Sequence, residues 1–197
     1  TQQSVRRSVD RIRALGAQHA SAYLLKIEPG TPYGQSPPPL PDDDAAADLY
    51  LTAADALSAA GYRQYEISNF AVPGHESRHN LKYWDSRPYL GIGPAASSCL
   101  GGHRFSYPRD IRDFINGGEP VDEPDPQIAP GSPEEYALLR LRLCDGLRED
   151  GFFARFGRMI PAVWRRRAAA LPGALAVCDA DGIRLPTQGF LESNALI

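Results

Sequence analysis

The sequence is poor in cysteine, the residue that holds iron–sulfur clusters and many zinc ions. It has only three cysteines, an odd number, at Cys99, Cys144 and Cys178. No two of them have the spacing of a zinc or iron–sulfur motif, which excludes both kinds of site from this sequence. We expect three reduced and mostly buried thiols, as in a cytoplasmic protein.

Basic excess and long apolar runs are also lacking. The chain has 21 Lys and Arg against 24 Asp and Glu, a formal net charge of −3. Such a balance does not predict nucleic-acid binding, because the chain has no excess of basic residues to neutralise phosphates. No stretch is apolar for long enough to predict a membrane span, and no signal peptide is recognisable at the start. The default expectation is a cytoplasmic protein.

The first residues predict a helix. Val5, Val9 and Ile12 lie on one apolar face, and Gly16 stands where a helix would stop. The chain begins with Thr1 rather than Met and runs directly into this helix. We therefore expect the later part of a longer polypeptide.

A strand, a helix and a strand follow. Residues 19–27 form an apolar run bounded by turn residues, Asp42 begins an acidic first helical turn, and Gly61 ends that helix before a second strand at 62–70. This alternation predicts an α/β fold with a parallel sheet or barrel and right-handed crossovers.

The stretch 89–100 is a third strand candidate with small residues in its middle. Gly91, Gly93 and their alanine neighbours would let a flat ligand or another backbone approach closely. A closely packed barrel strand explains the same residues, so both interpretations stay open. A short helix is expected over 108–115.

A change in composition over 119–131, rich in Pro, Asp and Glu, predicts a domain boundary. Ser132 then caps a helix with Pro133 in its first turn and Glu135 completing a capping box. Further helices and a two-stranded end follow, the outline of a winged helix. The basic run 165–167 is best read as a solvated helix face.

The strongest local signal runs from Tyr65 to Trp84. A short strand leads to a Pro-Gly turn, and two histidines, an asparagine and two aromatic residues follow at close spacing. Turn residues beside such a cluster predict a loop that carries a site on a rigid scaffold.

Several runs, in this order, resemble the HemW-type heme chaperones, relatives of the oxygen-independent coproporphyrinogen III oxidases in the radical SAM superfamily. The runs are His19-x-Ser-x-Tyr23, Ile27-Glu-Pro-Gly-Thr31-Pro, Gly61-Tyr, Tyr65-Glu-Ile-Ser-Asn-Phe70, Ser77-Arg-His-Asn-x-x-Tyr83-Trp84 and Tyr89-Leu-Gly-Ile-Gly-Pro-Ala-Ala96, with Arg184-Leu, Gly189-Phe-Leu and Ser193-Asn194 near the end. The resemblance covers nearly the whole chain, closely in the first half and loosely after Glu119.

The resemblance implies two parts. Residues 1–118 would be the C-terminal part of an incomplete (β/α) radical SAM barrel, and residues 119–197 a small helical, winged-helix-like domain. The Cys-x-x-x-Cys-x-x-Cys motif that holds a 4Fe-4S cluster in this superfamily is missing here. Cluster binding and cleavage of S-adenosylmethionine would therefore belong to the full-length parent.

The resemblance also implies a heme site. His79 would ligate the heme iron, Asn80 would orient the imidazole, and Tyr83 and Trp84 would pack on the macrocycle, in keeping with imidazole ligation and flat aromatic area. A plainer alternative is that His79 and Asn80 only hold a loop in place through backbone bonds.

The remaining candidates rank lower. His75 is a rival or sixth ligand that lies in the turn, whereas His19 and His103 are expected to be structural. By position, S-adenosylmethionine contacts of the oxidase relatives fall near Lys26 and Ser97, which differ in type from the apolar residues there.

Three functions follow as hypotheses. The first is part of a heme chaperone that passes heme to acceptor proteins. The second is a coproporphyrinogen III dehydrogenase, which would decarboxylate its substrate through a 5′-deoxyadenosyl radical. The third is a winged-helix binding module without enzymatic activity, against which the acidic charge argues.

Overall fold

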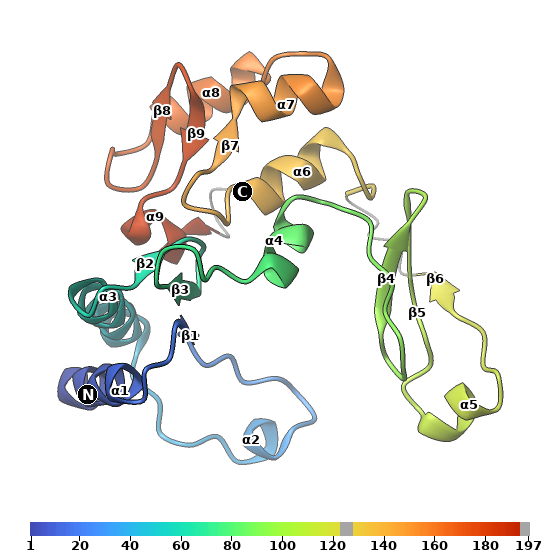
Figure 1. Cartoon of the computed structure of the whole chain (residues 1–197), viewed down its shortest axis with the longest axis horizontal. Coiled ribbons are helices and arrows are strands. Elements are labelled where there is room, and N and C mark those ends of the chain that lie inside the picture. The colour runs from blue at the N-terminus through green and yellow to red at the C-terminus, as the bar shows by residue number, and fades with distance from the viewer. Residues whose placement is uncertain (123–127, 194–197) are drawn as a thin grey trace.

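The computed structural model describes residues 1–122 and 128–193. Its elements form an N-terminal part, an arm and a C-terminal part (Figure 1). The N-terminal part comprises α1 (Gln2–Ala14), β1 (His19–Ser21), α2 (Pro32–Gln35), α3 (Asp43–Ala59), β2 (Arg63–Gln64), β3 (Asn69–Ala71) and α4 (Arg78–Trp84). The arm comprises β4 (Ser97–Leu100), β5 (His103–Ser106), α5 (Ile111–Ile115) and β6 (Val121–Asp122). The C-terminal part comprises α6 (Pro133–Arg140), β7 (Leu147–Arg148), α7 (Glu149–Phe156), α8 (Ala162–Ala169), β8 (Val177–Asp179), β9 (Gly182–Arg184) and α9 (Thr187–Leu191).

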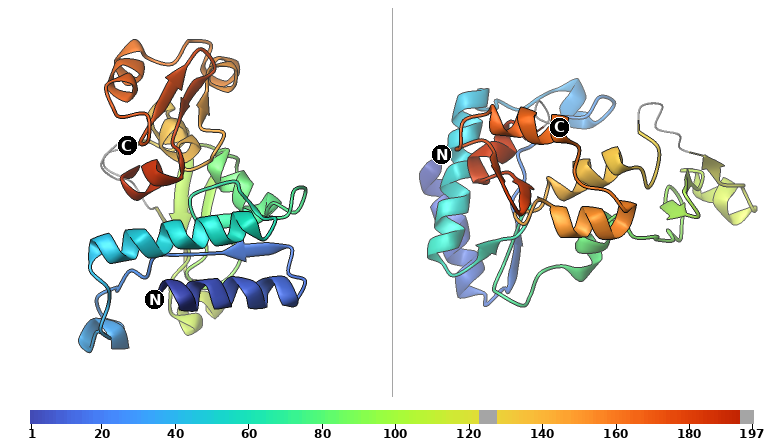
Figure 2. Two further views of the ribbon diagram at one scale, coloured as in Figure 1. Left: turned by 90° about the vertical axis from the view of Figure 1, so that its left-hand side faces the viewer. Right: turned by 90° about the horizontal axis from the view of Figure 1, so that it is seen from above.

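Helix α3 begins where the sequence predicts its cap. Asp42 accepts a hydrogen bond from the Ala45 amide at 2.8 Å and caps α3, as the acidic first turn predicts. Gly61 follows α3 with φ of +92°, a left-handed conformation that glycine adopts without strain. Helices α1 and α3 pack against each other and lie side by side (Figure 2).

The predicted parallel sheet is wrong in its pairing. The strand order is β1-β3-β2, and both β1 and β2 pair antiparallel with β3. The run 62–70 is a hairpin rather than one strand, because the Ser68 amide donates to the Glu66 carboxylate at 2.9 Å and tightens a turn inside it. Strands β1 and β2, joined through α3, therefore run in the same direction with β3 between them.

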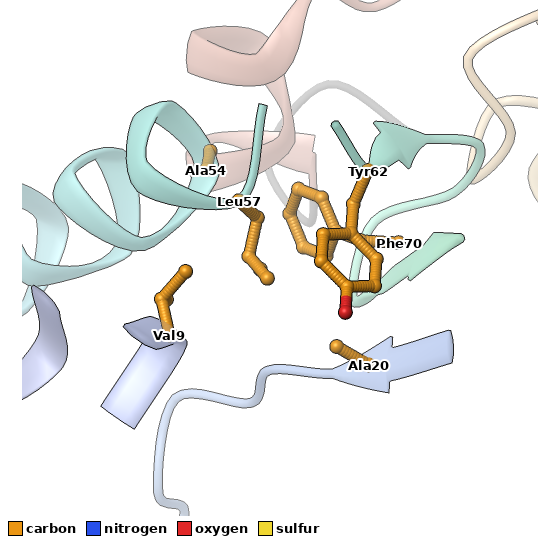
Figure 3. Close-up of a cluster of buried hydrophobic side chains, with 6 residues drawn as sticks. All are labelled: Val9, Ala20, Ala54, Leu57, Tyr62 and Phe70. Carbon is orange, nitrogen blue, oxygen red and sulfur yellow. The ribbon is translucent and has the colours of Figure 1, made fainter. Parts of the chain in front are cut away.

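A hydrophobic cluster holds α1, α3 and this sheet together (Figure 3). Phe70 and Leu57 are its most buried members, at 1% and 2% exposure. The Tyr62 ring packs in the cluster while its hydroxyl donates to the Ala17 carbonyl at 2.5 Å. The buried members are Val9, Ala20, Ala54, Leu57, Tyr62 and Phe70.

The arm is an antiparallel sheet of order β4-β5-β6. Gly101 and Gly102 both have positive φ and form the tight turn between β4 and β5. The predicted strand 89–100 is correct only over Ser97–Leu100, because Gly93 and Ala95 take positive φ and break the run. The arm projects from the rest of the chain in Figure 1.

In the C-terminal part, three helices precede the β8–β9 hairpin, the order that the sequence predicts, and β7 adds a strand beside β9. Phe152 is fully buried in its core. Ser132 caps α6, but Glu135 does not complete the predicted capping box; its carboxylate instead accepts from the Gly131 amide at 2.6 Å.

The N-terminal and C-terminal parts are joined by backbone bonds and by a shared core. The Ile67 amide donates to the Arg142 carbonyl at 2.9 Å, and the Cys144 amide donates to the Tyr65 carbonyl at 3.0 Å. A second cluster joins Tyr50 of α3 to Phe190 of α9. The division into 1–118 and 119–197 stays a prediction, and residues 123–127 of its boundary segment lie outside the described residues, as does Asn194.

Two expectations from composition can be compared with the described residues. None of the described helices is long and apolar enough to cross a membrane. Cys99, Cys144 and Cys178 are free, as expected, but each is half-buried rather than buried. Burial still raises the pKa of the Cys144 thiol to about 12, so this thiol stays protonated at neutral pH.

Candidate heme-binding helix

The residues of the predicted site lie on a short helix rather than in the predicted loop. Helix α4 begins after Ser77, whose hydroxyl accepts a hydrogen bond from the Asn80 amide at 3.3 Å. The Pro-Gly turn before it leaves Ser77 extended, the conformation of an N-cap. In Figure 1, α4 lies between the β2–β3 hairpin and α6.

The helical geometry places His79 and Tyr83 on one face. They are four residues apart, which is about one turn. The Tyr83 hydroxyl and His79 Nε2 are hydrogen-bonded at 3.1 Å, and the two rings meet edge to face with centroids 5.0 Å apart. His79 is exposed and Tyr83 half-buried. The plainer alternative predicts that His79 bonds to the backbone of a loop. The described hydrogen bond of its ring is instead with another side chain.

Asn80 and Trp84 are also four residues apart and lie on a neighbouring face of α4. Both are half-buried, and the Trp84 indole Nε1 is a buried donor with no partner among the described residues. The described hydrogen bond to the His79 ring comes from Tyr83, not from Asn80. The orienting role of Asn80 and the packing role of Trp84 therefore stay predictions.

Tyr89 is a member of the cluster that the sequence analysis missed. Its ring meets that of Tyr83 edge to face with centroids 4.6 Å apart. Backbone hydrogen bonds with Cys99 of β4 fix its position, and burial raises the pKa of its hydroxyl. In the sequence, Tyr89 begins the small-residue run 89–100, whose glycines indicate close approach of a backbone rather than an aromatic contact.

Tyr65 fixes the beginning of α4. Its hydroxyl accepts from the Ser77 amide at 3.3 Å and is hydrogen-bonded to His19 Nε2 at 2.9 Å. Burial raises the pKa of the Tyr65 hydroxyl, so it stays a neutral hydrogen-bonding group over the physiological range. His19 thus has the structural role that was expected of it.

The other histidines lie apart from this cluster. His75 is exposed in the turn and pairs its Nε2 with the Gln18 side-chain amide at 3.2 Å. His103 is exposed at the start of β5. Of His75, His79 and His103, His79 is therefore the one that the structure places against the Tyr83 ring.

The opposite face of α4 borders a cavity. Leu81 and Asp85 line it together with residues of the β2–β3 hairpin and of the loop after α6, and its volume is about 480 Å³. His79 is not among the lining residues, and its side chain is exposed on the other side of the helix.

The weaker cofactor candidates lie in different elements of the fold. Lys26 follows β1, is exposed and pairs with Glu28 at 2.9 Å, whereas Ser97 begins β4 in another sheet. Their roles toward S-adenosylmethionine stay predictions. Within residues 1–122 and 128–193, no group of three or more His, Cys, Asp or Glu could hold a metal ion. The residues present therefore do not fit an iron–sulfur cluster.

The fold resembles one solved structure throughout. Coproporphyrinogen III oxidase (HemN) from Escherichia coli, described as a radical SAM enzyme, matches with a TM-score of 0.68 over 100% of this chain and 50% of that one, at 14% identity. The chain thus shares the fold of about half of that oxidase. No protein-family model matches the chain.

Sequence comparison identifies the family. The chain is 35% identical over 189 residues to the heme chaperone HemW of Escherichia coli strain K12, covering 93% of this chain and 50% of that protein. It is 36% identical over 200 residues to HemW of Mycobacterium tuberculosis strain H37Rv, covering 97% and 49%. The chain belongs to the HemW-type heme chaperone family and corresponds to the C-terminal portion of its members. It spans about half the length of the curated relatives it matches.

Proposed function

We propose that this chain is the heme-binding portion of a cytoplasmic heme chaperone and that His79 supplies the axial ligand to the iron. The observation that carries the proposal is the exposed imidazole of His79, which meets the Tyr83 ring edge to face on the same helical face. Imidazole nitrogen is a common ligand of heme iron, and contact with a neighbouring ring limits the orientations of the imidazole.

The surroundings of His79 suit cargo rather than a permanent cofactor. A resident heme is usually enclosed, whereas this face is open and its aromatic members, Tyr83 and Tyr89, stand to one side. An open face lets heme leave toward an acceptor protein without unfolding of the site. Heme-accepting proteins are therefore the partners that the proposal expects.

The test is a titration of the full chain with ferric heme, followed by the Soret absorption band. Wild-type protein should bind saturably, and His79→Ala should weaken binding and shift the band. His103→Ala is the matched control, because it removes another exposed histidine and should leave both unchanged. Equal affinity and an identical spectrum for His79→Ala and the wild type would overturn the proposal.

Coproporphyrinogen oxidation is the second candidate, favoured by the fold shared with the E. coli oxidase. S-adenosylmethionine and a 4Fe-4S cluster would be bound mainly by residues outside this chain. Lys26 and Ser97 would add only minor contacts to S-adenosylmethionine. Turnover of coproporphyrinogen by the reconstituted full-length protein would support it.

The winged-helix-like arrangement of the C-terminal part is retained as a proposal, but a DNA-binding role has less support. Arg165, the first residue of the basic run, pairs with Glu149 and donates to the Asp179 carbonyl at 2.7 Å. These bonds occupy its guanidinium within the fold. Salt-sensitive DNA binding would revive this candidate.

A further inference from the structure

The two residues that follow α4 receive contacts from α6 and α7 of the C-terminal part. Arg140 of α6 pairs its Nη1 with Asp85 Oδ1 at 2.6 Å. Arg155 of α7 donates from Nη2 to the Ser86 carbonyl at 3.2 Å and to its hydroxyl at 3.3 Å. The Ser86 hydroxyl in turn donates to Glu135 of α6 at 3.5 Å.

The cationic partners in these contacts are themselves held in place. The Arg140 side chain is only 13% exposed and donates from Nε to the Gly146 carbonyl at 3.2 Å. The guanidinium of Arg155 lies over the Tyr136 ring, 5.1 Å from its centroid. A donor held at a second point positions its acceptor more effectively than one with no other contact.

Glu135 adds a third fixed group. It is 5% exposed, forms an ion pair with Arg104 of β5 and accepts from the Gly131 amide. Ser86 has φ of +51°, which is uncommon for a residue other than glycine and persists where neighbours over-determine the backbone. The chain after Trp84 is therefore fastened by three side chains of the C-terminal part.

Helix α4 needs such a fastening because it is short. A seven-residue helix is unstable alone in water, so its geometry depends on what holds its ends. Tyr65 holds the beginning through the Ser77 amide. Asp85, the C-cap residue, holds the end, and the last turn between these anchors carries Tyr83.

We propose that Asp85 and Ser86 are positioning residues through which α6 and α7 set the orientation of the His79–Tyr83 face. In this arrangement heme binding and docking of the C-terminal helices are coupled, so each strengthens the other. The inference rests on the proposed heme ligation for its functional consequence. The fastening of α4 itself is independent of heme and can be measured without it.

The test compares the full chain with Arg140→Gln, Arg140→Lys and Arg155→Ala variants. Arg184→Gln is the matched control, because Arg184 pairs with Asp179 at 2.6 Å in the same part of the chain without touching α4. The first readout is amide hydrogen exchange of residues 79–84 without heme, relative to that of α1. The second is heme affinity with the Soret spectrum.

We expect faster exchange of residues 79–84 and about tenfold weaker heme binding in Arg140→Gln, with α1 unchanged. Arg155→Ala should act in the same direction and is less able to prevent folding, since this arginine contacts Ser86 at the surface. Arg140→Lys, which keeps the charge, should restore part of the wild-type spectrum.

Wild-type exchange over 79–84 in both Arg140→Gln and Arg155→Ala would overturn the inference. So would wild-type heme affinity and spectrum in both variants. Faster exchange together with no heme binding by the wild type would instead contradict the proposed function and leave the fastening of α4 supported.

Discussion

His79 and Tyr83 are the residues whose spacing carries the most information. Four residues apart, they meet only if the segment is helical, and the structure shows their contact at 3.1 Å. The sequence analysis placed both residues in one predicted site but expected a loop there, because the preceding Pro-Gly turn dominates the local pattern. Tyr89 could not be found in this way, because it reaches Tyr83 only through the folding of the arm.

The hydroxyl and the ring of Tyr83 should have separable effects. Ligation of iron by Nε2 requires the loss of its hydrogen bond to the Tyr83 hydroxyl, so Tyr83→Phe should bind heme unchanged or up to about fivefold more tightly. Tyr83→Ala also removes the ring and should bind about threefold to tenfold more weakly. The measurement is heme titration of both variants. Equally weak binding by Tyr83→Phe would show that the hydroxyl, not the ring, contributes the affinity.

Among the elements, helices were easier to predict than strands. The caps at Asp42 and Ser132 are explicit in the sequence, because a capping side chain acts within three residues. The hairpin at 62–71 was hidden because its turn depends on Glu66, a buried residue whose backbone pairs with that of Leu143, far along the chain. The predicted parallel pairing was wrong for the same reason. Membership of the heme chaperone family therefore rests on the sequence comparisons rather than on strand direction.

Helix α4 should depend on its cap. Ser77→Ala removes the hydroxyl that accepts from the Asn80 amide and should lower the free energy of unfolding by about 1 kcal/mol. Heme affinity should fall with it, since the first turn carries His79. Urea denaturation and heme titration measure the two effects. Ser8→Ala on α1 is the control, and an equal loss in both variants would contradict a specific role for the cap.

At the scale of the whole molecule, Glu66 lies at the junction of the two parts. It is 1% exposed, and its backbone pairs with that of Leu143. Burial raises the pKa of the Glu66 carboxyl above 4.5, while hydrogen bonds from Ser68 and Asn69 oppose that rise. The folded state therefore holds this proton more tightly than the unfolded chain does.

The raised pKa of Glu66 makes the free energy of unfolding depend on pH. The contribution of Glu66 to the free energy of unfolding is fully present below the unfolded pKa and is lost as pH rises through the raised folded pKa. Glu66→Gln cannot titrate, so its stability relative to the wild type should increase from pH 4.5 upward and then level off. Urea denaturation across this range measures it. A stability profile of Glu66→Gln that runs parallel to that of the wild type across this range would contradict the account.

The central claim, that His79 ligates heme iron, is tested most directly by chemical rescue. His79→Gly should lose the wild-type Soret spectrum, and added imidazole should restore it by supplying the missing ligand to the iron. A His79→Gly protein that keeps the wild-type spectrum without imidazole would contradict the claim.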